Sequence, residues 1–447
     1  MPELQTEPKV MNRWLVVVGA LLVQLALGAI YAWSVFTKPL QAAPYSFSAT
    51  DTQLIFSTGL ATFAIVMVLA GRWMAKVGPR TVALSGGLLL GLGYVLGGLF
   101  GTSALAQIIT IGVIGGAGIG LGYVTPIAVG MRWFPDKKGL ITGLAVAGFG
   151  FGALGWIKLA GPWGNLLASF QIFGLPGVQS VFLLYGVIFA VMVCLGALVM
   201  VYPPEGWKPA GFETSALAPG AGASAPAPTA ASAFESGEML RTPQYYMLLT
   251  TFIFSSMAGL MTIGIIQLFG TDALQSAGLD AVAAAAIAST AMAVFYALAN
   301  GIGRIVWGMV ADKIGWKRAV VAMTALQGLT MLLFFWMGKQ EYLFYLGATI
   351  VGFNFGGNFA LFPVATADTF GAKNVGKNYG WVFLAYGVGG IFGPIMAGLF
   401  KDMGTGKGVE AWLPAFIISG VLCLIAAVLG SQIRRPRRAG EASAATR

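Results

Sequence analysis

The chain has 447 residues, of which 57% are apolar, only 9% are charged and 64 are glycine. So few charges cannot cover the surface of a soluble domain, so the composition excludes an ordinary soluble protein and indicates an integral membrane protein. The formal net charge is +10 and histidine is absent, which excludes a histidine proton relay.

Twelve apolar segments follow one another along the chain, each long enough for a helix to cross about 30 Å of hydrocarbon. None has the alternation of a membrane barrel strand. They begin near residues 14, 53, 80, 104, 138, 178, 244, 281, 317, 341, 378 and 411. The sequence therefore predicts an all-α membrane protein with twelve transmembrane helices.

A stretch rich in Ala, Pro, Gly and Ser separates the spans into two sets of six and is typical of a flexible, poorly ordered linker. We expect an N-terminal tail at 1–12, a six-helix bundle at 13–202, a cytoplasmic linker at 203–243, a second six-helix bundle at 244–433 and a basic tail at 434–447.

Most of the 26 Lys and Arg residues fall in connections on one side of the membrane if both termini are cytoplasmic. This topology and the attraction of the cations to anionic lipid explain the net charge, so we predict the lipid bilayer and no nucleic acid as a partner. Neither a cofactor nor a metal site nor an obligatory protein partner is evident. The compact loops and the lack of an organelle-type targeting segment favour a bacterial inner membrane.

One charged residue lies deep inside a predicted span. Arg304 sits in AVFYALANGIGRIVWGMVADK, where a charge costs on the order of 3 kcal/mol or more. Because no acid lies within two turns on its N-terminal side, its guanidinium can take a small organic anion as counter-ion. Tyr296 and Asn300 share its helix face by their spacing of four residues. The alternative is that Arg304 snorkels toward Asp312.

A segment of the first set recurs in the second. GRWMAKVGPR, from Gly71 to Arg80, matches GMVADKIGWK, from Gly308 to Lys317. The same offset relates three glycines of each set, namely Gly143, Gly150 and Gly152 with Gly380, Gly387 and Gly389. We expect two pseudo-symmetric halves with substrate bound between them near the midplane. The alternative is coincidence among abundant glycines.

The recurring segment resembles the loop motif of the major facilitator superfamily. The second copy matches at Gly308, Asp312, Lys313 and Gly315, followed by cations. The first copy keeps Gly71, Gly78 and Arg80 but has Ala75 in place of the aspartate. The resemblance implies a gating role for these positions and a weakened charge latch in the first half.

Two further segments are similar to a subgroup of that superfamily. RWFPDKKGLITGLAVAGFGFG resembles the entry to helix five of monocarboxylate transporters and of the bacterial oxalate/formate antiporter family, and GAIYAWSVF resembles helix one of the latter. In animal monocarboxylate transporters an aspartate precedes the arginine by one turn, whereas Asn300 here cannot carry a titrating proton. The oxalate exchanger uses a lysine in helix eleven, where Tyr386 stands here. One cation and one phenol favour a monoanion over a dianion.

Polar residues at the middle of other spans complete the predicted cavity, namely Gln24, Tyr31, Tyr123, Asn354 and Asn358. For each of them the alternative is a hydrogen bond between helices, worth about 0.6 kcal/mol on average. No Asp or Glu lies deep in a span, so a coupled proton has to travel on the substrate or on a nearby water.

These features predict a secondary active transporter of small monocarboxylates such as lactate, pyruvate or formate, not an enzyme. Proton-coupled symport by alternating access is the expected mechanism. One alternative is an oxalate/formate-type exchanger, in which the unfilled carrier cannot reorient because its cation stays unpaired. Another is a membrane carboxylate sensor that does not transport.

Overall fold

The computed structural model describes residues 11–161, 163–204, 207–209, 233–371, 374–404 and 406–436. Twelve helices within these ranges are long and apolar enough to cross a membrane, and they begin close to the predicted positions. No strand occurs among the described residues. The all-α membrane fold is therefore confirmed. Most of the expected linker, 210–232, and most of the basic tail, 437–447, lie outside the described residues.

The first half contains α1 (Arg13–Leu27), η1 (Gly28–Ala32), α2 (Ser34–Gln41), α3 (Ala49–Val77), α4 (Pro79–Phe100), α5 (Ala104–Gln107), η2 (Ile108–Gly115), α6 (Gly116–Trp133), α7 (Lys138–Ala160), α8 (Leu166–Ser169) and α9 (Gly177–Ala197). The second half contains α11 (Ser236–Met239), α12 (Pro243–Ser276), α13 (Ala281–Thr290), η4 (Ala291–Tyr296), α14 (Ala297–Ile314), α15 (Trp316–Met337), α16 (Glu341–Phe370), α17 (Val375–Met403), η6 (Gly408–Trp412) and α18 (Leu413–Gln432).

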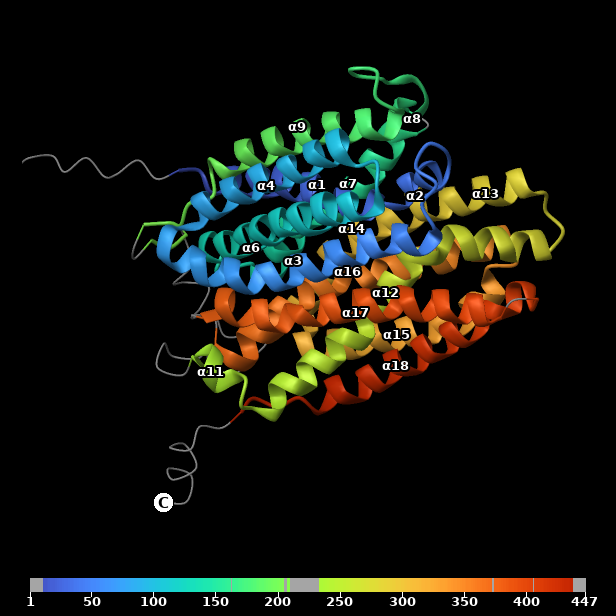
Figure 1. The fold of residues 1–447 in the computed structure, drawn as a ribbon. Coiled ribbons are helices and arrows are strands. Elements are labelled where there is room, and N and C mark those ends of the chain that lie inside the picture. The colour runs from blue at the N-terminus through green and yellow to red at the C-terminus, as the bar shows by residue number, and fades with distance from the viewer. Residues whose placement is uncertain are drawn as a thin grey trace, which may run out of the picture.

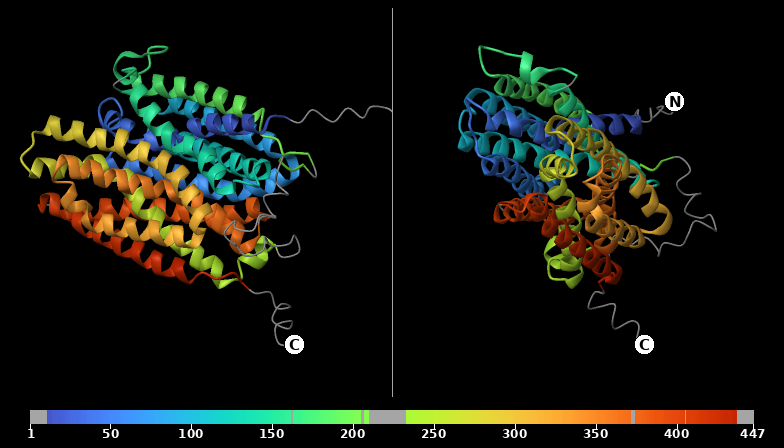
Figure 2. Two further views of the ribbon diagram at one scale, coloured as in Figure 1. Left: turned by 180° about the vertical axis from the view of Figure 1, so that it is seen from behind. Right: turned by 90° about the vertical axis from the view of Figure 1, so that its right-hand side faces the viewer.

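The two sets of spans pack first within themselves and then against each other. In the first half α4 packs on α9 and α3 on α6, and in the second half α15 packs on α18 and α12 on α17. Contacts between the halves are made chiefly by α7 with α14 and by α3 with α17. Figure 1 shows the helices side by side, with blue to green elements along one edge and orange to red ones along the other. The start of α1 and the end of α18 lie at the same end of the bundle, here called the terminal end (Figure 2).

Equivalent glycines let the two halves approach closely. A Cβ on Gly143 of α7 would lie 2.3 Å from the carbonyl oxygen of Arg304, and one on Gly380 of α17 would lie 3.1 Å from the Cα of Val68 in α3. Small residues at such contacts bring helix backbones together in a membrane, where no hydrophobic effect drives helix association. The repeat predicted from the sequence is therefore also seen in the packing, because glycines at equivalent positions of the two halves each contact the opposite half.

The recurring loop motif forms equivalent turns in both halves. Gly78 and Gly315 stand between consecutive spans with φ values of 82° and 84°, a backbone region that glycine enters at little cost. In the first copy the Arg80 side chain donates to the carbonyl of Leu198, at the end of α9. The turns thus join the spans at the terminal end of the bundle.

Candidate functional site

The structure buries Arg304 completely, with 0% of its surface exposed. The side chain projects from α14, and its Nε donates to Oδ1 of Asn300, one turn earlier, at 2.9 Å. Its Nη1 donates to the backbone carbonyl of Val146 in α7 at 3.0 Å. The second of these bonds joins the two halves of the molecule. Asp312 is not a partner of the guanidinium, so the structure differs from the snorkelling alternative.

Two phenylalanine rings complete the surroundings of the guanidinium. Its Cζ lies 4.0 Å from the ring centroid of Phe359 in α16 and 5.2 Å from that of Phe149 in α7. Each ring face attracts a cation, and the attraction grows when water is excluded. Nη2 of Arg304 has no hydrogen-bond partner among the described residues. The site therefore holds a positively charged donor with one nitrogen still available for an anion.

Arg304 is the only charged side chain among the fully buried polar residues of the described chain. The repeat places Met67 of α3 at the equivalent position in the first half, and Met67 is also fully buried. The two halves are thus alike in backbone packing but differ in charge at this point. A site between them carries one cation, not two.

Three predicted tyrosines converge on this region. The hydroxyl of Tyr386 in α17 donates to the hydroxyl of Tyr31 in η1 at 2.9 Å, and this bond also joins the two halves. The hydroxyl of Tyr123 in α6 has no hydrogen-bond partner in the described part of the chain, although it lies within electrostatic reach of Arg304. Tyr31 also lies within electrostatic reach of Arg304. The Tyr386 proton is therefore used within the protein, whereas Tyr31 accepts that bond and Tyr123 has no described partner.

The backbone of α6 is adapted around Tyr123. Pro126 has no N–H to offer the carbonyl of Gly122, and the hydroxyl of Thr125 donates to that carbonyl instead at 2.9 Å. The side chain of Gln24 in α1 donates to the Tyr123 carbonyl at 3.3 Å, which leaves the Oε1 of Gln24 without a described partner. Gln24 therefore fixes α6 against α1.

The predicted asparagines of α16 differ in their surroundings. The amide of Asn358 accepts a bond of 2.7 Å from the hydroxyl of Ser255 and donates to the Phe355 carbonyl. The amide of Asn354 is buried, and neither of its polar atoms has a partner among the described residues. Tyr296 donates to the carbonyl of Gly259 at 3.0 Å. Asn354 is thus available to a ligand, whereas Asn358 and Tyr296 already tie helices of the second half together.

Several residues around the site were missed by sequence reasoning. Tyr379 of α17 is buried, its hydroxyl has no described partner, and it lies within electrostatic reach of Arg304 and Tyr123. Its spacing of seven residues from Tyr386 puts both on nearly one helix face, a signal that could have identified it. The rings of Phe63 and Phe383 lie 5.5 and 4.9 Å from that of Tyr386. They give the site an apolar wall.

A π-helical segment, η4, directly precedes the part of the span that carries Asn300 and Arg304. Such segments are rare, are usually confined to a single turn and are frequent at functional sites. By changing the helical phase, η4 shifts the direction in which Tyr296 points relative to the residues that precede it. A second π-helical segment, η2, lies in the fourth span.

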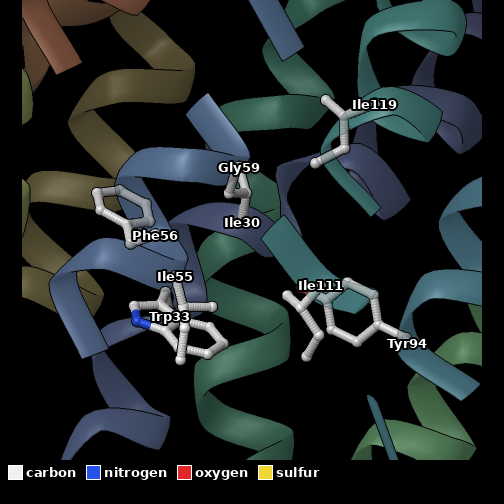
Figure 3. Close-up of a pocket in the computed structure, with 8 residues that line it drawn as sticks. All are labelled: Ile30, Trp33, Ile55, Phe56, Gly59, Tyr94, Ile111 and Ile119. Atoms are coloured by element: carbon white, nitrogen blue, oxygen red, sulfur yellow. The ribbon is translucent and has the colours of Figure 1, made fainter. Parts of the chain in front are cut away.

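A separate small pocket lies inside the first half (Figure 3). It is lined by Ile30, Trp33, Ile55, Phe56, Gly59, Tyr94, Ile111 and Ile119, and its volume is ≈ 10 Å³. That volume holds one water at most. The Nε1 of Trp33 donates to the Thr52 carbonyl. Arg304 is not among the lining residues. This pocket is therefore a packing defect and does not resemble a carboxylate site.

The second loop motif joins the halves at the terminal end. Oδ2 of Asp312 accepts a bond of 3.1 Å from the backbone N–H of Leu140, in the first turn of α7. A carboxylate at a helix N-terminus is stabilised by the free N–H groups and by the helix dipole. Gly308 is buried and Lys313 is exposed. In the first copy, Gly71 makes a close backbone contact with Gly376 of α17, and Ala75 offers no carboxylate there.

Comparison with known proteins agrees with this architecture. The sequence matches the family model of the Major Facilitator Superfamily over residues 13–295 and 282–446. The chain belongs to the major facilitator superfamily. It is therefore a membrane transporter and not an enzyme.

Individual relatives cover nearly all of the chain. The "Uncharacterized MFS-type transporter YhjX" of Escherichia coli (strain K12) is 31% identical over 85% of this chain and 86% of its own length. The "Oxalate:formate antiporter" of Oxalobacter formigenes is 28% identical over 94% of this chain and 91% of its own. The "Apicoplast pyruvate carrier 1" of Toxoplasma gondii is 27% identical over 85% of this chain and 82% of its own.

Proposed function

We propose that the protein is a secondary active transporter of small monocarboxylates of the lactate, pyruvate or formate type, working by alternating access as a proton symporter. The observation that carries the proposal is the single buried cation, Arg304, at the seam between the halves. A guanidinium can donate two parallel bonds to a carboxylate, and these bonds are strong where water is excluded.

The surroundings of Arg304 supply further contacts to a bound monocarboxylate. Nη2 is available, and the carboxylate completes a two-bond pairing when it displaces the Val146 carbonyl from Nη1. Asn300 keeps its bond to Nε and so orients the guanidinium. The hydroxyls of Tyr31 and Tyr123 then donate to the carboxylate, and the apolar wall accommodates a short carbon skeleton.

A single cation selects against dicarboxylates. A second carboxylate would leave water without a cationic partner, because the equivalent position in the first half holds Met67. An unpaired charge in such a site costs several kcal/mol, on the order of the values that exclude charges from membrane interiors. The transporter therefore prefers a monoanion over oxalate.

The coupled proton does not travel on a carboxylate of the protein. No Asp or Glu is found among the buried residues of the described chain, and the sequence contains no His. We propose that the proton moves on the substrate or on a water beside it, with both termini and the linker in the cytoplasm of a bacterial cell. Bacterial relatives that match over most of the chain support the inner membrane as its location.

The relation to the oxalate:formate antiporter favours a second candidate, an exchanger of carboxylates. One experiment separates the two candidates. Purified protein in liposomes is given labelled lactate, pyruvate, formate or oxalate, with or without an imposed pH gradient and with or without internal counter-substrate. Symport predicts uptake driven by the gradient into liposomes without counter-substrate. Uptake that occurs only with internal carboxylate would establish exchange instead.

A further inference from the structure

A groove lies at the terminal end of the second half, between the start of α15 and the end of α18. It is lined by Lys317, Arg318, Val321, Ala322 and Ser431, and its volume is ≈ 490 Å³. The two helices pack directly on one another.

Two cations in this groove have no acceptor. Neither Lys317 nor Arg318 makes a hydrogen bond or an ion pair with any described residue. The hydroxyl of Ser431 lies across the groove, where it donates to the Val428 carbonyl and keeps its lone pairs. Two cations that line one groove attract an anion to it.

The first half shows how an equivalent cation is used when the protein supplies its partner. The repeat aligns Arg80, at the start of α4, with Lys317, at the start of α15. Arg80 donates to the carbonyl of Leu198, at the end of α9. In the second half the end of α18 offers no such bond to Lys317. The difference leaves the cation at this position of the second half without a partner among the described residues.

Apolar side chains continue from the groove along both helices. On α15, Leu329 and Leu333 follow Arg318 at helical spacing and are 54% and 58% exposed. On α18, Val428 and Ile425 precede Ser431 on one face and are 57% and 42% exposed. These two rows of apolar side chains border the contact between α15 and α18, here called the α15–α18 seam, and Lys317 and Arg318 lie at its terminal end. A ligand that fits both parts has an anionic head and long hydrocarbon chains.

We propose that this groove binds one anionic phospholipid, with its phosphate on Lys317 and Arg318 and its acyl chains along the α15–α18 seam. Charge complementarity decides against a zwitterionic lipid, whose ammonium group would repel the two cations. The presence of the two apolar rows decides against free phosphate. The proposal is independent of the transported substrate.

The test compares lipid retention by the full chain and by two charge-matched variants. Wild-type protein, K317Q/R318Q and the control K76Q/K137Q are purified in detergent. Each is titrated with dioleoyl phosphatidylglycerol, dioleoyl phosphatidylcholine or inorganic phosphate, and bound molecules are counted by native mass spectrometry. Lys76 and Lys137 belong to the same end of the molecule but lie outside the groove.

We expect wild type and the control to bind phosphatidylglycerol equally and K317Q/R318Q to bind it about 30-fold more weakly, as expected for two lost cation contacts. Melting curves check that all three proteins are folded. Equal retention by K317Q/R318Q and the control would overturn the proposal. Phosphatidylcholine or inorganic phosphate binding as tightly as phosphatidylglycerol would overturn the assignment to an anionic lipid.

Discussion

Replacing Arg304 by methionine separates the role of its charge from its role in packing. The substitution makes the second half resemble the first, where buried Met67 occupies the equivalent place. A carboxylate bound by two charge-assisted hydrogen bonds of about 1.5–3 kcal/mol each loses at least about 3 kcal/mol of binding. That loss corresponds to about 150-fold weaker binding. We therefore expect R304M to lose monocarboxylate uptake at ordinary substrate concentrations.

The folded protein should tolerate the same substitution. The Oδ1 of Asn300 and the carbonyl of Val146 lose their donor, at a cost of about 1–3 kcal/mol each. Replacing buried ionic groups by apolar side chains of similar volume often gains about 1–4 kcal/mol. Because these contributions nearly cancel, the melting temperature should stay within a few degrees of wild type.

The assay is uptake of labelled lactate, pyruvate and formate into proteoliposomes, with M67L as a control at the equivalent position. A purely structural role for Arg304 predicts the opposite pattern, with a strongly lowered melting temperature and residual uptake at wild-type affinity. Normal uptake by folded R304M would refute the assignment of Arg304 as the substrate-binding cation.

Three further substitutions test neighbouring parts of the site. N300D puts a carboxylate beside the guanidinium of Arg304, where it competes with the substrate carboxylate. Uptake should therefore fall at neutral pH and recover at acid pH, when the new carboxylate is protonated. A pH profile of uptake parallel to that of wild type would contradict this. D312N weakens the acceptor for the Leu140 N–H, and a side-chain cap of a helix is worth about 0.5–2 kcal/mol. Hydrogen exchange of the backbone amides in the first turn of α7 should therefore become about 2- to 30-fold faster. Unchanged exchange would show that Asp312 does not cap this helix. F359L removes the ring closest to Arg304, whose attraction to the cation is worth up to about 2 kcal/mol when desolvated. We expect net uptake to slow by up to about 30-fold and exchange between filled carriers to stay nearly unchanged. Equal loss of both rates would exclude a role of Phe359 in the return of the unfilled carrier.

The spans and the buried arginine could be predicted because their signals are local. A helix that crosses a bilayer needs about twenty apolar residues in a row, and a charge within such a row stands out by its cost. Asn300 followed from its spacing of four residues to Arg304. In the structure these two side chains form the predicted local pair.

The partners of Arg304 from other helices could not be predicted. The Val146 carbonyl is a backbone group and leaves no mark in the residue types, while Phe149 and Phe359 are two of 30 phenylalanines. The same limit applies to Asn354 and Asn358. They share a helix face by spacing, but only the position of α12 decides that Asn358 meets Ser255.

The bonds of Arg304 bear on the choice between exchange and symport. Obligatory exchange requires that the unfilled carrier cannot close, because its cation would be left unpaired in a dry passage. In the closed packing of the halves, however, the protein itself offers the guanidinium an amide oxygen, the Val146 carbonyl and two ring faces. The Val146 carbonyl and the Phe149 ring belong to the first half, so they meet the guanidinium as the halves close around it and are exchanged for water as the halves part. Asn300 and Phe359 lie in the same half as Arg304. Closure without cargo is therefore compensated in part, and this favours the return step that symport needs. Removal of the Phe359 ring tests this reasoning, because its attraction to the guanidinium grows as closure excludes water, while a bound carboxylate supplies its own compensation in the filled carrier.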